Sequence, residues 1–92
     1  MARGRCDLCH KESTFEETED GFYTNCDDCR SYFLSKEVLR EFRGTPVWDE
    51  MRSVVGRYSA RYNAEHPNEM LMIRTPAEFR DFYNLQLGIE RG

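Results

Sequence analysis

The clearest hydrophobic pattern in the chain lies in residues 45–67. Apolar residues recur there at helical spacing and would form one stripe along a helix: Val47, Met51, Val54, Val55, Tyr58 and Tyr62. Thr45 is suited to the N-cap, Pro46 to the first helical position, and Pro67 follows the last periodic residue. We therefore predict a helix that ends before Pro67 and packs through this stripe.

A second helix is predicted over residues 76–87. Thr75 is suited to its N-cap, Pro76 to the first helical position and Gly88 to the residue past its end. Its apolar side would be formed by Phe79, Phe82 and Tyr83. The short apolar run before it, residues 70–73, is consistent with a strand or with a buried connector, because periodicity cannot distinguish the two at this length.

The N-terminal third has a different pattern, which predicts a β-hairpin followed by a helix. Residues 13–17 and 21–25 are rich in Phe, Tyr and Thr and are separated by an acidic turn. Residues 27–43 have helix-forming residues, with acids at the start and bases at the end. Gly44 would stop this helix, although Ser35 could cap a second short helix and divide the segment into two.

These elements together predict a small α+β protein. Residues 1–44 would form one module, a β-hairpin plus helix, and residues 45–92 a helical part packed on it in one compact unit. The chain has 92 residues, of which 39% are hydrophobic, enough for a folded protein but not for a large core. We therefore expect an additional source of stability.

The net charge of −4 is unevenly distributed along the chain. Residues 1–29 contain eight acidic and three basic residues, whereas residues 30–92 contain nine acidic and ten basic residues. The acidic part coincides with the cysteines, which disfavours general binding to a phosphate backbone.

The chain contains no run of 18 apolar residues and its N-terminus lacks the apolar stretch of a secretory signal. We therefore expect a cytoplasmic protein that does not associate with membranes. Because the cytosol is reducing, its four cysteines favour a metal site over disulfides.

All four cysteines of the chain fall into one pattern, C-x2-C-x16-C-x2-C. The spacing predicts a tetrahedral site in which four thiolates hold one Zn²⁺ ion, with Cys6, Cys9, Cys26 and Cys29 as the ligands. Iron in a rubredoxin-like tetrathiolate site is the weaker alternative, and a redox dithiol would need only one of the two pairs.

The first pair with its following histidine, Cys6, Cys9 and His10, also matches the attachment signature of a c-type haem. Haem would use this pair for thioether bonds and leave Cys26 and Cys29 without a role. We therefore interpret His10 as a polar residue beside the metal-binding turn.

Residues 6–36 resemble a treble-clef zinc finger. The segment "CDLCHKE" corresponds to the zinc knuckle, and "YTNCDDCRSYFLSK" to the end of the hairpin and the start of the helix. Similar segments occur in GATA-type and nuclear-receptor fingers, in the N-terminal zinc domain of ClpX and in Gin-like anti-sigma factors. The resemblance implies that the second cysteine pair lies in the first turn of a helix. GATA-type fingers read DNA, whereas the ClpX-like and Gin-like domains dimerise or bind proteins.

We expect a zinc-stabilised adaptor or regulator that binds another protein, as part of a transcription or defence machine. The helix expected after the hairpin opens with Asp27 and Asp28, which argues against DNA reading. The candidate partner surface combines the acidic hairpin tip with aromatic residues that would be exposed: Glu16, Glu17, Glu19, Asp20, Phe22, Tyr23 and Trp48. The alternative for these aromatic residues, and above all for Trp48, is ordinary packing in the core. So compact a chain would suit a phage, and a dimer is compatible with the sequence.

Nucleic-acid binding through the post-finger helix is the alternative function. It would use a basic patch on one side of that helix, formed by Arg30, Lys36, Arg40 and Arg43. Arg57 and Arg61 could extend this patch. No catalytic triad, glycine-rich phosphate loop or paired-carboxylate signature stands out, so we expect no enzymatic activity.

Overall fold

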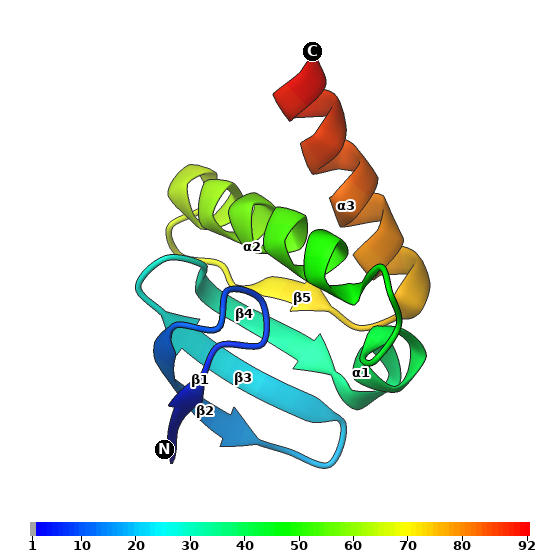
Figure 1. Cartoon of the computed structure of the whole chain (residues 1–92). Helices are drawn as coiled ribbons and strands as arrows, with labels where there is room; N and C mark the ends of the chain where they lie inside the picture. The colour runs from blue at the N-terminus through cyan, green and yellow to red at the C-terminus, as the bar shows by residue number, and fades with distance from the viewer. Residues whose placement is uncertain (1) are drawn as a thin grey trace.

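The computed structural model describes residues 2–92, which form a five-stranded sheet and three helices (Figure 1). The elements in chain order are β1 (Ala2–Arg5), β2 (Glu12–Glu17), β3 (Gly21–Cys26), β4 (Arg30–Ser35), α1 (Lys36–Phe42), α2 (Trp48–Glu65), β5 (Leu71–Ile73) and α3 (Pro76–Arg91). Strands β1 to β4 are antiparallel neighbours, and β5 lies parallel to β4 at the edge of the sheet.

The predicted hairpin is confirmed as β2 and β3, which pair from Ser13 opposite Cys26 to Glu17 opposite Phe22. The Thr18 hydroxyl donates to the Gly21 carbonyl at its tip, over 3.1 Å. Gly21 is required there because a Cβ would overlap the carbonyl oxygen of Leu34 on the neighbouring strand. The acidic residues of the turn are exposed, as expected for a solvated hairpin tip.

The helix predicted from residue 27 is wrong in its first part, because Arg30–Ser35 is strand β4. This strand buries Tyr32, Phe33 and Leu34 together, on both faces of the sheet. It is a central strand with β3 on one side and β5 on the other, and β5 lies far along the chain. Helix propensity in this segment therefore gives way to a long-range strand partner.

The alternative of a short helix capped by Ser35 is confirmed. The Ser35 hydroxyl accepts a hydrogen bond from the Val38 amide, 3.2 Å away, and α1 then runs to Phe42. Val38, Leu39 and Phe42 are buried, so this helix contributes to the core despite its length.

Most of the apolar stripe predicted for residues 45–67 is confirmed in α2. Met51, Val54 and Val55 are buried, whereas Val47 is 47% exposed and lies outside the helix at its N-cap. The predicted start is wrong: the Thr45 hydroxyl does not cap α2 and instead donates to the Phe42 carbonyl, over 2.6 Å.

The third helix begins as predicted and ends later. The Thr75 hydroxyl accepts a hydrogen bond from the Glu78 amide, 3.1 Å away, and Pro76 is the first residue of α3. The helix continues through Gly88 to Arg91, and in this last part the guanidinium of Arg57 in α2 donates two hydrogen bonds to the Glu90 carboxylate. These hydrogen bonds from Arg57 lower the pKa of Glu90 to about 2, so the ion pair persists at neutral pH.

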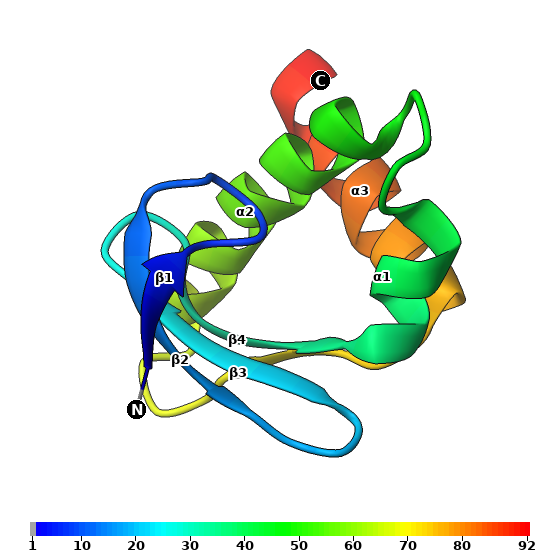
Figure 2. The ribbon, with the colours of Figure 1, turned by 60° about the horizontal axis from the view of Figure 1, so that its bottom comes forward.

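The two faces of the sheet are covered unequally. Figure 2 shows α2 and α3 on one side of the sheet and α1 at its end. We call the face under α2 the inner face. Its side chains include one row across four strands: Phe15, Thr24, Tyr32 and Leu71. The opposite, outer face carries the neighbouring row, which consists of Glu16, Tyr23, Phe33 and Met72.

The core lies between the inner face and the helices. Trp48 of α2 stacks on Phe79 of α3, with ring centroids 5.8 Å apart, and Phe42 of α1 contacts the same ring. Strand β5 joins the sheet beside β4, so residues from both halves of the chain share this core. Within residues 2–92, no helix has the length and apolar character that a membrane span requires.

Candidate metal centre

The two cysteine pairs lie in two turns of similar backbone shape. The first turn follows β1, and its Cys6 amide donates to the Lys11 carbonyl, over 2.8 Å. The second joins β3 to β4, where Cys26 lies opposite Arg30 in the antiparallel ladder. In each turn the residue after the second cysteine has a left-handed backbone, with φ of 64° at His10 and 66° at Arg30. Both pairs therefore lie in tight turns between strands.

This arrangement corrects the helical setting that the treble-clef resemblance implies for the second pair. The residues after Cys29 continue as a strand, so neither pair lies in the first turn of a helix. His10 is an exposed residue of the first turn, in agreement with its interpretation as a polar residue beside the site.

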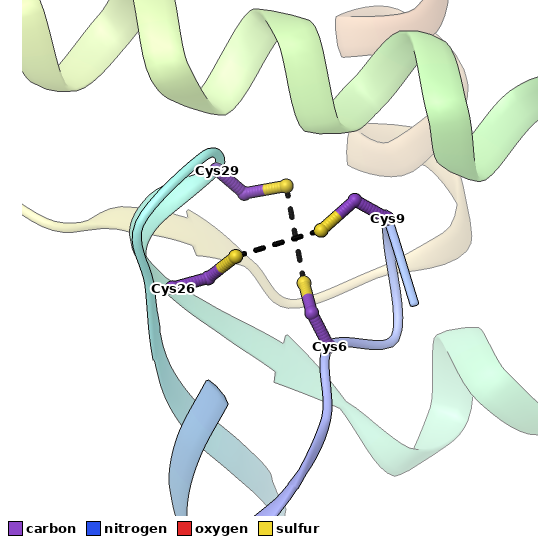
Figure 3. A group of neighbouring side chains, drawn as sticks. All are labelled: Cys6, Cys9, Cys26 and Cys29. Atoms are coloured by element: carbon purple, nitrogen blue, oxygen red, sulfur yellow. Dashed lines mark hydrogen bonds between the residues drawn. The ribbon is translucent and has the colours of Figure 1, made fainter. Parts of the chain in front are cut away.

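The four sulfur atoms converge on one point between the turns (Figure 3). All of them lie within 4.8 Å of one another, and the two facing pairs are closer, with 3.8 Å from Cys6 to Cys29 and 3.5 Å from Cys9 to Cys26. A tetrahedral ion with metal–sulfur distances of about 2.3 Å would have sulfur–sulfur edges of about 3.8 Å. The group therefore has the size and ligand set to hold a metal ion.

The cysteines are free thiols in the structure, since none of them forms a disulfide. Each facing pair joins one turn to the other, so a bound ion would cross-link the start of the chain to the β3–β4 turn. That cross-link is a stabilising contribution of the kind expected for a chain with a small core.

The electrostatics of the site favour a cation. Cys6, Cys26 and Cys29 are buried and Cys9 is half-buried. The hydrogen bond between Cys6 and Cys29 lowers the pKa of Cys6 to about 5, while burial raises the pKa of Cys9 to about 11. The site alone thus tolerates a thiolate at Cys6 but not four thiolates together. A metal ion would supply the positive charge that permits all four.

Tyr32 supports the site from the inner face of β4. Its hydroxyl lies 3.0 Å from the Cys6 sulfur and its ring is fully buried. Burial also raises the pKa of Tyr32, so the hydroxyl stays protonated and can donate to a thiolate. Hydrogen bonds of this kind orient metal ligands and stabilise their charge.

Helix α2 covers the centre with a polar stripe that the sequence analysis missed. The Arg52 guanidinium donates to the Leu8 carbonyl over 2.9 Å, and the Ser59 hydroxyl donates to the Cys29 carbonyl over 2.6 Å. Between them, a Cβ at Gly56 would lie 3.0 Å from the Cys29 sulfur. Asn63 extends the stripe with a hydrogen bond of 3.0 Å to the Ser31 carbonyl.

The sequence contained a signal for this stripe. Its residues recur at the helical spacing of i, i+4, i+7 and i+11, beside the apolar stripe. In the structure Arg52 and Gly56 hold α2 close to the two cysteine turns.

The residues predicted for a partner surface separate into three groups. Glu16, Glu19, Asp20 and Tyr23 are exposed, on or beside the outer face. Glu17 forms an ion pair with Lys36, 2.8 Å away, and Phe22 is half-buried against Phe15. The expectation that Trp48 lies on the surface is wrong: its side chain is in the core, stacked on Phe79.

The basic residues predicted for nucleic acid do not share one side of a helix. Arg30 is the first residue of β4, and α1 begins only at Lys36. Within the part of the chain that the structure describes, three of the six have carboxylate partners: Lys36 pairs with Glu17, Arg57 with Glu90 and Arg61 with Glu65. Arg40 and Arg43 are exposed at and after the end of α1.

A hollow of about 500 Å³ lies on the outer face, at the end of the sheet next to α1. Tyr23, Phe33 and Met72, three members of the outer row, contribute side chains to it. Its rim includes Glu19 and Asp20 from the hairpin tip. We call this feature the outer-face hollow. It brings the acidic tip and an exposed aromatic residue of the predicted partner surface into one place.

The comparisons with protein-family models, curated proteins and solved structures found no match to this chain. The features from which a function can be inferred are therefore the cysteine group and the outer-face hollow.

Proposed function

We propose that the cysteine group binds one Zn²⁺ ion as a structural centre. The support is a closed set of four sulfur ligands, three of them buried, at the spacing of a tetrahedral ion. Four protein ligands leave no open coordination position for a substrate or water, which is typical of structural and not of catalytic zinc. The centre would hold the two turns together, and the protein would not be an enzyme.

Native mass spectrometry of the purified chain tests this step. We expect a mass increase equal to one zinc ion, which disappears in the Cys26→Ser variant. A single bound iron ion, with the visible absorption of an iron tetrathiolate, would show that the site holds iron and not zinc. A metal-free chain with an unchanged fold would contradict a structural metal altogether.

We further propose that the protein is an adaptor or regulator that binds another protein through the outer face of its sheet. The observation that carries this proposal is the outer-face hollow, where Tyr23 is 38% exposed beside buried Phe33. Large aromatic residues at the surface are enriched in protein interfaces. Neither the metal centre nor the packing of the helices explains why the residues of this hollow are exposed.

A photo-cross-linking residue in place of Tyr23 tests this surface in the native cell. We expect a cross-link to one protein, and that protein, once purified, should bind the zinc-loaded chain but not its Tyr23→Ser variant. The matched control carries the cross-linker at Asn84, an exposed position on α3. Equal cross-linking from both positions, or unchanged binding of the Tyr23→Ser variant, would contradict the proposal.

Nucleic-acid binding has weaker support, because its candidate residues are dispersed and half of them are paired with carboxylates. A gel-shift measurement at low salt tests it directly. A strongly salt-dependent shift that is lost in an Arg40→Ala and Arg43→Ala double variant would favour this function over protein binding.

A further inference from the structure

The outer-face hollow has a charge distribution that specifies the kind of side chain it can receive. Glu19 and Asp20 from the hairpin tip and Glu37 from α1 contribute carboxylates to its lining. Glu16 lies on the same face, directly opposite Tyr23 in the β2–β3 ladder. Among residues 2–92, none of these four carboxylates has an ion-pair partner.

Most of the basic residues that line the hollow, unlike its acidic residues, are paired with an oppositely charged side chain. Lys36 pairs with Glu17 at 2.8 Å, and Arg74 pairs with Glu78 at 3.6 Å; both carboxylates belong to residues outside the lining. Lys36 also lies over the Phe22 ring, 5.7 Å from its centroid. Arg40 is the one lining base without an ion pair in the described part of the chain. Uncompensated charge in and beside the hollow is therefore predominantly negative.

The aromatic side of the hollow suits a cation as well. The Tyr23 ring packs against Phe33 with centroids 4.8 Å apart and an interplanar angle of 51°, while Tyr23 remains 38% exposed. An exposed tyrosine ring attracts a cation placed over its face, and neighbouring carboxylates add to that attraction. A planar guanidinium can stack on the ring and also donate paired hydrogen bonds to a carboxylate, which an ammonium cannot do.

We infer that the outer-face hollow receives an arginine side chain of the partner protein, stacked on Tyr23 and bound by the carboxylates of Glu19 and Asp20. This inference rests on the proposed protein-binding function and adds the chemistry of the partner. Met72 and Phe33 lie next to Tyr23 across β4 and β5. An apolar residue beside the arginine would contact the half-buried Met72.

Selection of short random peptides on the immobilised, zinc-loaded full chain tests this inference. We expect the selected peptides to share an arginine next to an apolar residue. Their Kd should rise by at least about tenfold when that arginine becomes glutamine, as is typical for an arginine at the centre of an interface. Replacement by lysine should restore only part of the binding, because lysine lacks the planar fork.

Variants of the chain locate the binding site. The Glu19→Gln and Asp20→Asn double variant keeps the side-chain volumes and the backbone hydrogen bond from the Lys36 amide to the Asp20 carbonyl. This double variant should raise the Kd of the arginine-containing peptides by at least about tenfold. The control is Glu12→Gln, which removes a carboxylate that lies on the same sheet face outside the hollow and pairs with Arg3 at 3.7 Å, and it should leave the Kd unchanged. Zinc content and circular dichroism establish that each variant is folded.

The outcomes separate this inference from the function on which it rests. One outcome is that the selected peptides fail to bind the Tyr23→Ser variant and yet contain no arginine, or contain acidic residues. This result would overturn the inference of an arginine in the hollow but would still support a protein-binding surface there. Selected peptides that bind the Tyr23→Ser variant unchanged would overturn both. Self-association of the chain that Tyr23→Ser abolishes would show a second copy in the hollow and also overturn the inference.

Discussion

The inner and outer faces belong to the same five-stranded sheet but have different surroundings. On the inner face, Tyr32 contacts the metal centre and Leu34 and Ile73 are buried under the helices. On the outer face, Tyr23 and Met72 retain solvent exposure because no helix within residues 2–92 covers them. The comparison teaches that burial divides the sheet into two unlike surfaces. The inner face is buried under the helices and joined to the cysteine group, whereas the outer face is the one through which we propose that a partner binds.

The proposed metal ion should have the largest effect on stability, because it would join the two cysteine turns. We expect a chelator, or the Cys26→Ser variant, to abolish cooperative unfolding, since apparent binding energies of structural zinc are about 10–16 kcal/mol. Cys6, Cys26 and Cys29 belong to the same core cluster as residues of the helices, so the loss of structure should extend to the helices. Far-UV circular dichroism with and without chelator measures this. Zinc added back should restore the transition, and an unchanged transition in metal-free protein would show that the inner face is stable alone.

A charge under α2 should have the next largest effect. Val54 is 4% exposed, so Val54→Asp would bury a carboxylate and should lower the free energy of unfolding by at least about 3 kcal/mol. Thermal unfolding of the zinc-loaded chain measures the change.

Val47→Asp is the matched control, because Val47 belongs to the same predicted stripe but lies exposed at the N-cap. Aspartate is favourable at that position, so this variant should unfold at the same or a higher temperature. Equal destabilisation by both substitutions would contradict the difference in burial between Val54 and Val47.

The hydrogen bond between α2 and the second cysteine turn should contribute less. Ser59→Ala removes the donor to the Cys29 carbonyl and leaves that buried acceptor unpaired, which should cost about 1–3 kcal/mol. It should also speed the transfer of metal to a chromophoric chelator. Ser53→Ala serves as the comparison, since the Ser53 hydroxyl accepts a hydrogen bond only from an exposed arginine. Identical metal-transfer rates in the two variants would show that the hydrogen bond from α2 does not affect how firmly the metal is held.

The outer face should be nearly neutral for stability. Tyr23→Ser loses the contact between Tyr23 and Phe33 and should lower the free energy of unfolding by less than about 1 kcal/mol. Urea unfolding monitored by circular dichroism measures this. A loss as large as that of Val54→Asp would show that Tyr23 is part of the core and would remove the distinction between the faces.

Several local features could be predicted because neighbouring residues determine them. The hairpin, the Ser35 and Thr75 caps and the apolar stripe of α2 follow from turn chemistry, capping and periodicity within short segments. The four cysteines could be grouped because two close pairs at this spacing are typical of one metal site.

Other features depend on residues far apart in the chain. The segment Arg30–Ser35 has no local pattern that excludes a helix, and it is a strand because β3 and β5 hydrogen-bond to it on both sides. Trp48 is buried because Phe79 of α3 packs on it. These contacts have no representation in a sequence window, which is why the helical setting of the second cysteine pair and the exposure of Trp48 were wrong.

By itself, the sequence determined the ligand set, the hairpin and the helices α2 and α3, since each depends on spacing over a short stretch of chain. Only the tertiary structure decided that both cysteine pairs lie in turns between strands, that Gly56 admits the Cys29 sulfur against α2, and that one face of the sheet stays uncovered. The physical reason is that burial and strand pairing are properties of the assembled chain, in which distant segments compete for the same surfaces.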